Sequence, residues 1–160
     1  MKQYDSISRD VVYGNTIYAF DKLDGSNIRA EWSHKKDFWK FGSRTQLIDD
    51  SHEPLGESIE LIKANFEKNV TDILKKNRIQ KSTLFFEFYG ESSFAGRHFD
   101  ESHKVSLIDV SIHKRGYLLP KDYLKWFGNL DMASLLYHGT CNQTLKELVY
   151  NSELPDMTFE

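Results

Sequence analysis

The feature that most constrains the fold is the stretch Lys22–Asn27, which joins two segments with the composition of β-strands. Residues Thr16–Asp21 and Asn27–Trp32 are rich in β-branched and aromatic side chains, and the Asp24-Gly25 pair can adopt the positive φ of a sharp reversal. One interpretation is a plain β-hairpin, for which Asp-Gly between alternating apolar runs is a strong signal. The other is a reactive lysine, because an amine held at such a corner can attack phosphorus if its pKa is lowered or its target is neutralised.

Composition indicates one well-buried domain. The chain has 160 residues, of which 39% are hydrophobic and 28% charged, with a formal net charge of −3. No apolar run is long enough to cross a bilayer, and the N-terminus lacks the apolar segment of a signal peptide, so we expect no membrane partner. The single Cys141 cannot form an internal disulfide, which favours a reducing compartment and hence a cytoplasmic location. The net charge does not exclude nucleic acid, because a local basic groove matters more than the sum.

The pattern of apolar residues predicts strands and helices without strict alternation, which is typical of an α+β fold with largely antiparallel sheets and flanking helices. Spacings of three and four residues predict one helix whose apolar stripe is Ile59, Ile62, Phe66, Val70 and Ile73. A second helix is predicted to begin at Pro120 and continue to Phe127, and a third to be capped by Asn142. The predicted strands are residues 16–21, 27–32 and 37–42 as a meander, 82–89 closed by Gly90, 104–112, and 135–137.

Several polar residues interrupt these strands. Glu87 lies in an otherwise apolar strand, where a carboxylate is unfavourable unless it binds something or lies at an edge facing water. Asp109 poses the same question in a strand where Val105, Leu107, Asp109 and Ser111 are expected to face one side. Arg44 follows Gly42-Ser43, where its guanidinium could grip a phosphate or form a surface ion pair.

Taken together, these residues resemble the covalent nucleotidyltransferases, namely the ATP-dependent ligases of DNA and RNA and the enzymes that cap messenger RNA. The first motif of that superfamily, lysine-any-aspartate-glycine, matches Lys22–Gly25. The next three elements match Phe41–Arg44, Leu84–Gly90 and Leu107–Val110, in the order that the superfamily has them. Tyr137-His138-Gly139 is similar to the stretch that precedes the fourth motif. Asn27 stands where nick-sealing RNA ligases of the phage type have asparagine, whereas DNA ligases and capping enzymes have arginine.

The resemblance implies a chemistry and a set of roles. Lys22 would attack the α-phosphorus of ATP to form a lysyl-AMP intermediate, with Mg²⁺ offsetting the charge of the phosphates. AMP would then pass to an RNA 5′-phosphate, and a 3′-hydroxyl would displace it to seal the strand. Arg44 would act with Lys22 in catalysis by holding the phosphate or the RNA end. The remaining nucleotide contacts implied are Asp21 near the adenine amino group, Leu23 and Ile108 beside the base, Asn27 near the phosphate and Glu87 at the ribose hydroxyls.

Three departures from the pattern are visible. Ile108 replaces the aromatic residue that such ligases stack on adenine, and Asp21 replaces a glutamate. Glu160 matches only the first letter of the fourth motif, a candidate metal ligand, and the later phosphate-binding lysines are absent. We therefore expect residues 1–160 to be a partial adenylyltransferase domain of the ATP-grasp-like ligase type that is C-terminally incomplete and weakly active. A missing C-terminal segment or another chain would then be a partner. The alternatives are a non-catalytic nucleotide- or RNA-binding fragment and an ATP-dependent DNA ligase.

Overall fold

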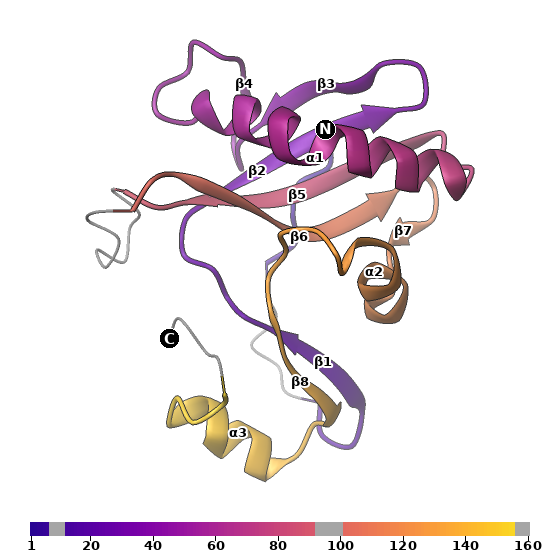
Figure 1. The fold of residues 1–160 in the computed structure, drawn as a ribbon. Helices are drawn as coiled ribbons and strands as arrows, with labels where there is room; N and C mark the ends of the chain where they lie inside the picture. The colour runs from indigo at the N-terminus through magenta and orange to yellow at the C-terminus, as the bar shows by residue number, and fades with distance from the viewer. Residues whose placement is uncertain (7–11, 92–100, 156–160) are drawn as a thin grey trace. The chain divides into compact units, whose positions relative to one another are not determined.

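The computed structural model describes residues 1–6, 12–91 and 101–155 (Figure 1). The described chain forms two compact units, the first made of Met1–Tyr4 with Asp24–Met132 and the second of Asp5–Leu23 with Ala133–Glu160. The architecture is α+β with antiparallel strand pairing throughout both sheets, which confirms the predicted fold class.

The first unit is built on a six-stranded sheet in the order β4-β3-β2-β5-β6-β7. Two helices belong to the same unit, α1 (Glu57–Lys76) and α2 (Pro120–Phe127). The strands of the sheet are β2 (Ser26–Ser33), β3 (Asp37–Gly42), β4 (Leu47–Ile48), β5 (Lys81–Tyr89), β6 (Lys104–Ile112) and β7 (Gly116–Tyr117). The predicted bounds of β3, β6 and α2 are confirmed, and β5 begins one residue earlier than predicted.

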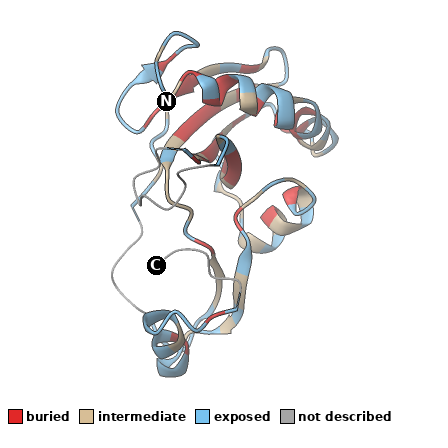
Figure 2. Ribbon diagram, turned by 60° about the vertical axis from the view of Figure 1, so that its left-hand side comes forward, coloured by how far each residue is buried: buried red, intermediate tan, exposed pale blue. Residues whose placement is uncertain are grey.

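One face of this sheet packs against α1. The rings of Phe66 on α1 and Phe86 on β5 are 5.0 Å apart, and the buried Trp32 indole N–H on β2 donates to Thr71 Oγ1 on α1 over 2.8 Å. Figure 2 shows buried residues concentrated on β2, β5, β6 and α1. The predicted apolar stripe is confirmed except at its end, where Leu74 is buried in place of the half-buried Ile73. Helical geometry explains the difference, since four-residue steps from Phe66 through Val70 lead to Leu74.

The second unit contains a two-stranded sheet and a helix. Strand β1 (Thr16–Phe20) pairs antiparallel with β8 (Leu135–Thr140), and α3 (Gln143–Tyr150) follows. The side chain of Asn142 accepts a hydrogen bond of 2.8 Å from the Leu145 N–H, as expected of the predicted cap.

The hairpin interpretation of the Lys22 stretch is wrong. Strand β1 pairs with β8, whereas β2 pairs with β3 and β5, so the two strands on either side of Lys22 belong to different sheets. The meander therefore consists of β2, β3 and β4 without β1. Gly25 is also not among the glycines with positive φ. A side chain there would instead meet the backbone of β5, because an added Cβ would lie 2.9 Å from the Phe88 carbonyl carbon.

Candidate functional site

Polar side chains gather on the face of the six-stranded sheet opposite α1. Register places Asn27, Glu87 and Ser106 in one row across β2, β5 and β6, and Arg29, Phe85 and Asp109 in the neighbouring row. Since side chains two residues apart on a strand share a face, both rows lie on one surface. We call this surface, with Asn27, Arg29, Glu87, Ser106 and Asp109, the polar face.

Glu87 lies in the interior of the sheet. Strand β5 pairs with β2 on one side and with β6 on the other, so the interpretation of Glu87 as an edge residue is wrong. The Glu87 side chain is half-buried between Asn27 and Ser106. A carboxylate in the middle of a sheet needs polar surroundings, and the register supplies them in Asn27 on one side and Ser106 on the other.

A β-bulge in β6 determines which residues accompany Glu87. Phe86 pairs with Leu107 and Phe85 with Asp109, so Ile108 has no residue opposite it. The expectation that Val105, Leu107, Asp109 and Ser111 face one side is therefore wrong, because an extra residue reverses the alternation beyond it. The bulge brings Asp109 to the polar face with Glu87, and places Ile108, the residue expected beside the adenine base, at the bulge itself.

Asn27 presents an unused acceptor on the polar face. Its Nδ2 donates to the Phe86 carbonyl oxygen over 3.4 Å, while its buried Oδ1 has no hydrogen-bond partner in the described part of the chain. Buried polar atoms without a partner are uncommon in folded proteins, so this oxygen indicates a missing donor. In the orientation observed, the atom that Asn27 offers suits a hydroxyl group or a cation better than a phosphate oxygen.

The first four residues of the chain lie across the polar face, a contact that sequence reasoning missed. The Tyr4 hydroxyl donates to Asp109 Oδ2 over 3.5 Å, and the Tyr4 ring lies 4.9 Å from the Phe85 ring. The Arg29 guanidinium, which is 4% exposed, donates to the backbone carbonyls of Met1 and Lys2. Burial lowers the pKa of Arg29, and the nearby Glu31 carboxylate opposes that effect. The one feature of the sequence that could have pointed to Arg29 is its position two residues after Asn27, which puts both side chains on one face of the strand.

Asp109 is a carboxyl group whose protonation is coupled to folding. Burial raises its pKa to about 6, although hydrogen bonds from the Val110 N–H and Tyr4 and the charge of Lys2 act in the opposite direction. Because the folded-state pKa exceeds the unfolded value of about 3.9, the group stabilises the fold at low pH. That contribution is lost as the pH rises through about 6.

We therefore expect Asp109→Asn to become more stable than the wild type as the pH rises from about 4 to 7, by roughly 1–2 kcal/mol at the upper end. The amide keeps the acceptor for the Val110 N–H, a hydrogen bond of 2.7 Å, and removes the buried charge. Urea unfolding of both proteins at several pH values measures the difference. A difference in unfolding free energy that does not vary with pH would contradict this assignment.

The other predicted site residues lie in two places. In the first unit, Arg44 is exposed in the loop between β3 and β4, and its carbonyl oxygen accepts from Gln3 Nε2 over 3.4 Å. In the second unit, Asp21 follows β1 directly, and its N–H donates to the Ser134 carbonyl oxygen over 2.8 Å. Lys22 is exposed and Leu23 half-buried at the point where the chain leaves that unit.

Two further predictions concern a metal ligand and the absence of a membrane partner. Glu160, the predicted metal ligand, lies outside the described residues. Across residues 1–6, 12–91 and 101–155, no group of three or more histidine, cysteine, aspartate or glutamate residues could hold a metal ion. Helices in the same ranges are all too short or too polar to cross a membrane. A cytoplasmic location stays a prediction.

The fold is similar to that of solved RNA ligase structures. A variant of the Naegleria gruberi RNA ligase with AMP and Mn matches 86% of this chain with a TM-score of 0.65 and 16% sequence identity. A variant without ligand matches 87% with a TM-score of 0.64 and 17% identity, and one with ATP and Mn matches 86% with a TM-score of 0.63 and 15% identity.

This chain spans 41% of the length of those ligase chains. No protein-family model and no curated protein matches the sequence. At this level of identity the comparison concerns the arrangement of the backbone. The chain therefore has an α+β fold similar to that of part of these RNA ligase chains.

Proposed function

We propose that this chain is the adenylylating part of an ATP-dependent RNA ligase, most similar to the nick-sealing ligases of the phage type. The observation that carries the proposal is the row in which Asn27 and Glu87 pair directly across β2 and β5. Two residues that were singled out by separate motifs thus meet on one sheet, in a fold shared with an RNA ligase. Within the described residues the Asn27 Oδ1 in this row has no hydrogen-bond partner, which supports a ligand there.

The polar face suits the sugar of a nucleotide. A ribose carries hydroxyl donors, and Glu87 and the Asn27 Oδ1 offer acceptors side by side on neighbouring strands. We therefore infer that Glu87 and Asn27 both serve the ribose or a bound cation, which extends the role expected for Asn27 at the phosphate. Arg44, exposed after β3, would grip phosphate through its two-point donor geometry.

Mg²⁺ bound with ATP would offset the charge on the phosphates and orient the leaving pyrophosphate. The carboxylates of Glu87 and Asp109 on the polar face are hard oxygen ligands of the kind that Mg²⁺ prefers. Glu160 remains a further candidate ligand by resemblance. Adenine would lie near Asp21, Leu23 and Ile108.

Lys22 is the proposed nucleophile. Its Nζ lone pair would form a bond to the α-phosphorus, the bond from phosphorus to the pyrophosphate oxygen would break, and the amine proton would leave to solvent. Only three residue steps separate Lys22 from Gly25, whose backbone packs against β5. A chain of that length reaches at most about 11 Å, and the proposal requires Lys22 and Glu87 to come together across this short connection. The adenylyl group would then pass to an RNA 5′-phosphate for sealing by a 3′-hydroxyl.

The test is intact-mass measurement after incubation of the chain with ATP and Mg²⁺. We expect a mass increase of one AMP on the polypeptide, stable to denaturation and removed by acid, as a phosphoramide bond should be. A parallel incubation with GTP distinguishes capping chemistry, since a GMP adduct alone would contradict the ligase assignment. Peptide mapping should place the adduct on Lys22.

The non-catalytic alternative gives a different result in the same experiment. A fragment that only binds nucleotide would bind ATP reversibly, as measured by calorimetry, and show no adduct.

A second experiment tests transfer of AMP to RNA. A nicked RNA duplex whose ends are a 5′-phosphate and a 3′-hydroxyl is added to the pre-adenylylated chain. Transfer to a DNA nick but not to an RNA nick would favour the DNA ligase alternative.

A further inference from the structure

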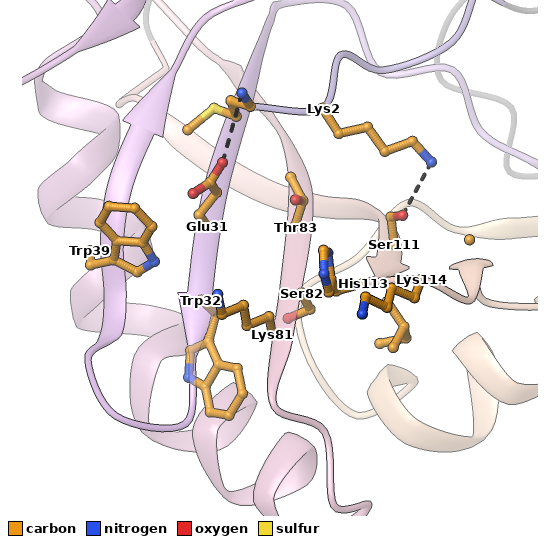
Figure 3. Close-up of a pocket in the computed structure, with 13 residues that line it drawn as sticks. Lys2, Glu31, Trp32, Trp39, Lys81, Ser82, Thr83, Ser111, His113 and Lys114 are labelled. Atoms are coloured by element: carbon orange, nitrogen blue, oxygen red, sulfur yellow. Dashed lines mark hydrogen bonds and ion pairs between the residues drawn. The ribbon is translucent and has the colours of Figure 1, made fainter.

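A recess opens on the same sheet, away from Asn27 and Glu87. It has a volume of about 490 Å³ and is formed entirely by residues of the first unit (Figure 3). Its floor is the cross-strand row Glu31, Thr83 and Ser111 on β2, β5 and β6. Thr83 precedes Glu87 by four residues on β5, which corresponds to about 13 Å along the strand. The two sites are therefore separate places on one surface.

The rim of this recess is rich in cations. Lys2 closes one side, where its Nζ donates to Ser111 Oγ over 3.1 Å and lies 3.3 Å from the centroid of the Tyr117 ring. Lys81 and Lys114 lie on the other side with His113, whose backbone N–H donates to the Lys81 carbonyl oxygen over 3.1 Å. Figure 3 shows these side chains around the row on the floor.

The charge balance of the recess favours an anion. Among the described residues that line it, the one carboxylate is that of Glu31, which forms an ion pair with the Met1 α-ammonium group over 3.9 Å. Lys81 and Lys114 make no ion pair with any residue in the described ranges. Three lysines around one recess are the kind of groups that hold phosphate oxygens.

An aromatic side chain stands beside these cations. Trp39 lines the recess and is 46% exposed, although tryptophan is usually well covered. It is the extra residue of a second β-bulge, because Glu31 pairs with Lys40 and Trp32 with Phe38. Bulges redirect side chains, and this one turns an indole ring to the surface. The ammonium groups of Lys36 and Lys40 lie 5.0 Å and 5.7 Å from the ring centroid.

We propose that this recess binds a single-stranded segment of the polynucleotide substrate, with its phosphates at Lys81 and Lys114 and one base stacked on Trp39. An exposed aromatic ring next to a row of ammonium groups is the combination that single-stranded nucleic acids require. A free phosphate ion would use the lysines but would leave Trp39 without a role. The inference rests on the proposed function, because strand sealing is what brings RNA to this sheet.

The test is fluorescence anisotropy with a fluorescein-labelled single-stranded RNA of about twelve nucleotides and the whole chain. We expect Lys81→Gln with Lys114→Gln to weaken binding at least tenfold. The same change should reduce the slope of log affinity against log salt by roughly 1.4, since each phosphate contact on a single strand contributes about 0.7. The matched control is Lys68→Gln with Lys76→Gln on α1, which removes equal charge on the opposite side of the sheet and should change affinity less than twofold.

Trp39 gives an independent readout. We expect Trp39→Ala to weaken binding about tenfold and Trp39→Phe to recover most of it, because stacking needs a ring of any kind. Inorganic phosphate should compete only weakly with RNA. Three results would each overturn the proposal: an equal loss of RNA affinity in the Lys81/Lys114 variant and in the Lys68/Lys76 control, no effect of Trp39→Ala, or full competition by phosphate.

The AMP adduct of the wild-type chain, measured on the same preparation, separates this inference from the proposed function. If the adduct forms but the RNA affinity does not depend on Lys81, Lys114 and Trp39, the proposal that the recess binds RNA is wrong and the ligase assignment stands. RNA binding that depends on these residues without any adduct would overturn the assignment of Lys22 and leave the recess in place. Circular dichroism of every variant checks that the fold is retained.

Discussion

Replacing Lys22 by alanine is expected to abolish the covalent AMP adduct, which is the largest effect that we predict for any single substitution. The reason is chemical, since alanine has no nitrogen with which to form a phosphoramide bond. Lys22 is exposed, so the substitution should leave the unfolding free energy within about 0.5 kcal/mol of the wild type. Intact-mass measurement after incubation with ATP and Mg²⁺ reports the adduct, and urea unfolding reports the stability.

Two further variants make the Lys22 result specific. Lys22→Arg keeps the positive charge but should also give no adduct, because a guanidinium stays protonated and is a poor nucleophile. Lys35→Ala removes an exposed lysine from the turn between β2 and β3 and should form the adduct at the wild-type level. An adduct that persists in Lys22→Ala, or one that is lost in Lys35→Ala, would refute the assignment of the nucleophile.

The second large effect is expected from Gly25→Ala. A Cβ at this position would lie 2.9 Å from both the Phe88 carbonyl carbon and Tyr89 Cβ, closer than such atoms approach in proteins. Because the contact is with strand backbone, the clash cannot be relieved by a rotamer change, and the connection that follows Lys22 must move. We expect a loss of roughly 2 kcal/mol or more in unfolding free energy. Urea unfolding measures this loss.

Gly25→Ala should also slow adduct formation, since it displaces the segment that links Lys22 to β2. Ser26→Ala is the matched control: it changes the next residue, which is exposed, and should alter neither stability nor adduct formation appreciably. If Gly25→Ala were as stable as Ser26→Ala, the close packing of this connection against β5 would be wrong.

Local sequence patterns predicted the individual elements of this fold well. The run Ser82–Tyr89 is long, apolar and ended by a glycine, and it forms β5 with Gly90 at φ 127°. Helix α1 follows from a stripe that repeats every three or four residues, and α3 from the Asn142 cap. In each case the signal and the structure depend on residues that are close in sequence.

The polar face was only partly predictable. Glu87 and Asn27 stood out as polar residues in strands, and the structure pairs them. Arg29 and the segment Met1–Tyr4 were missed, because the contacts of Arg29 with the Met1 and Lys2 carbonyls span more than 25 residues of sequence. Nothing in the order of residues near Tyr4 indicates that its hydroxyl reaches Asp109.

Amino-acid order alone was therefore sufficient for the α+β class, most strand and helix positions, and the residues most worth testing. Long-range strand pairing settled the rest: it assigned β1 and β2 to different sheets and inserted bulges at Trp39 and Ile108. A bulge is the product of register between two strands, and a single strand carries little trace of it. For that reason the cross-strand neighbours of Glu87 and the exposure of Trp39 can be known only once the strands are paired.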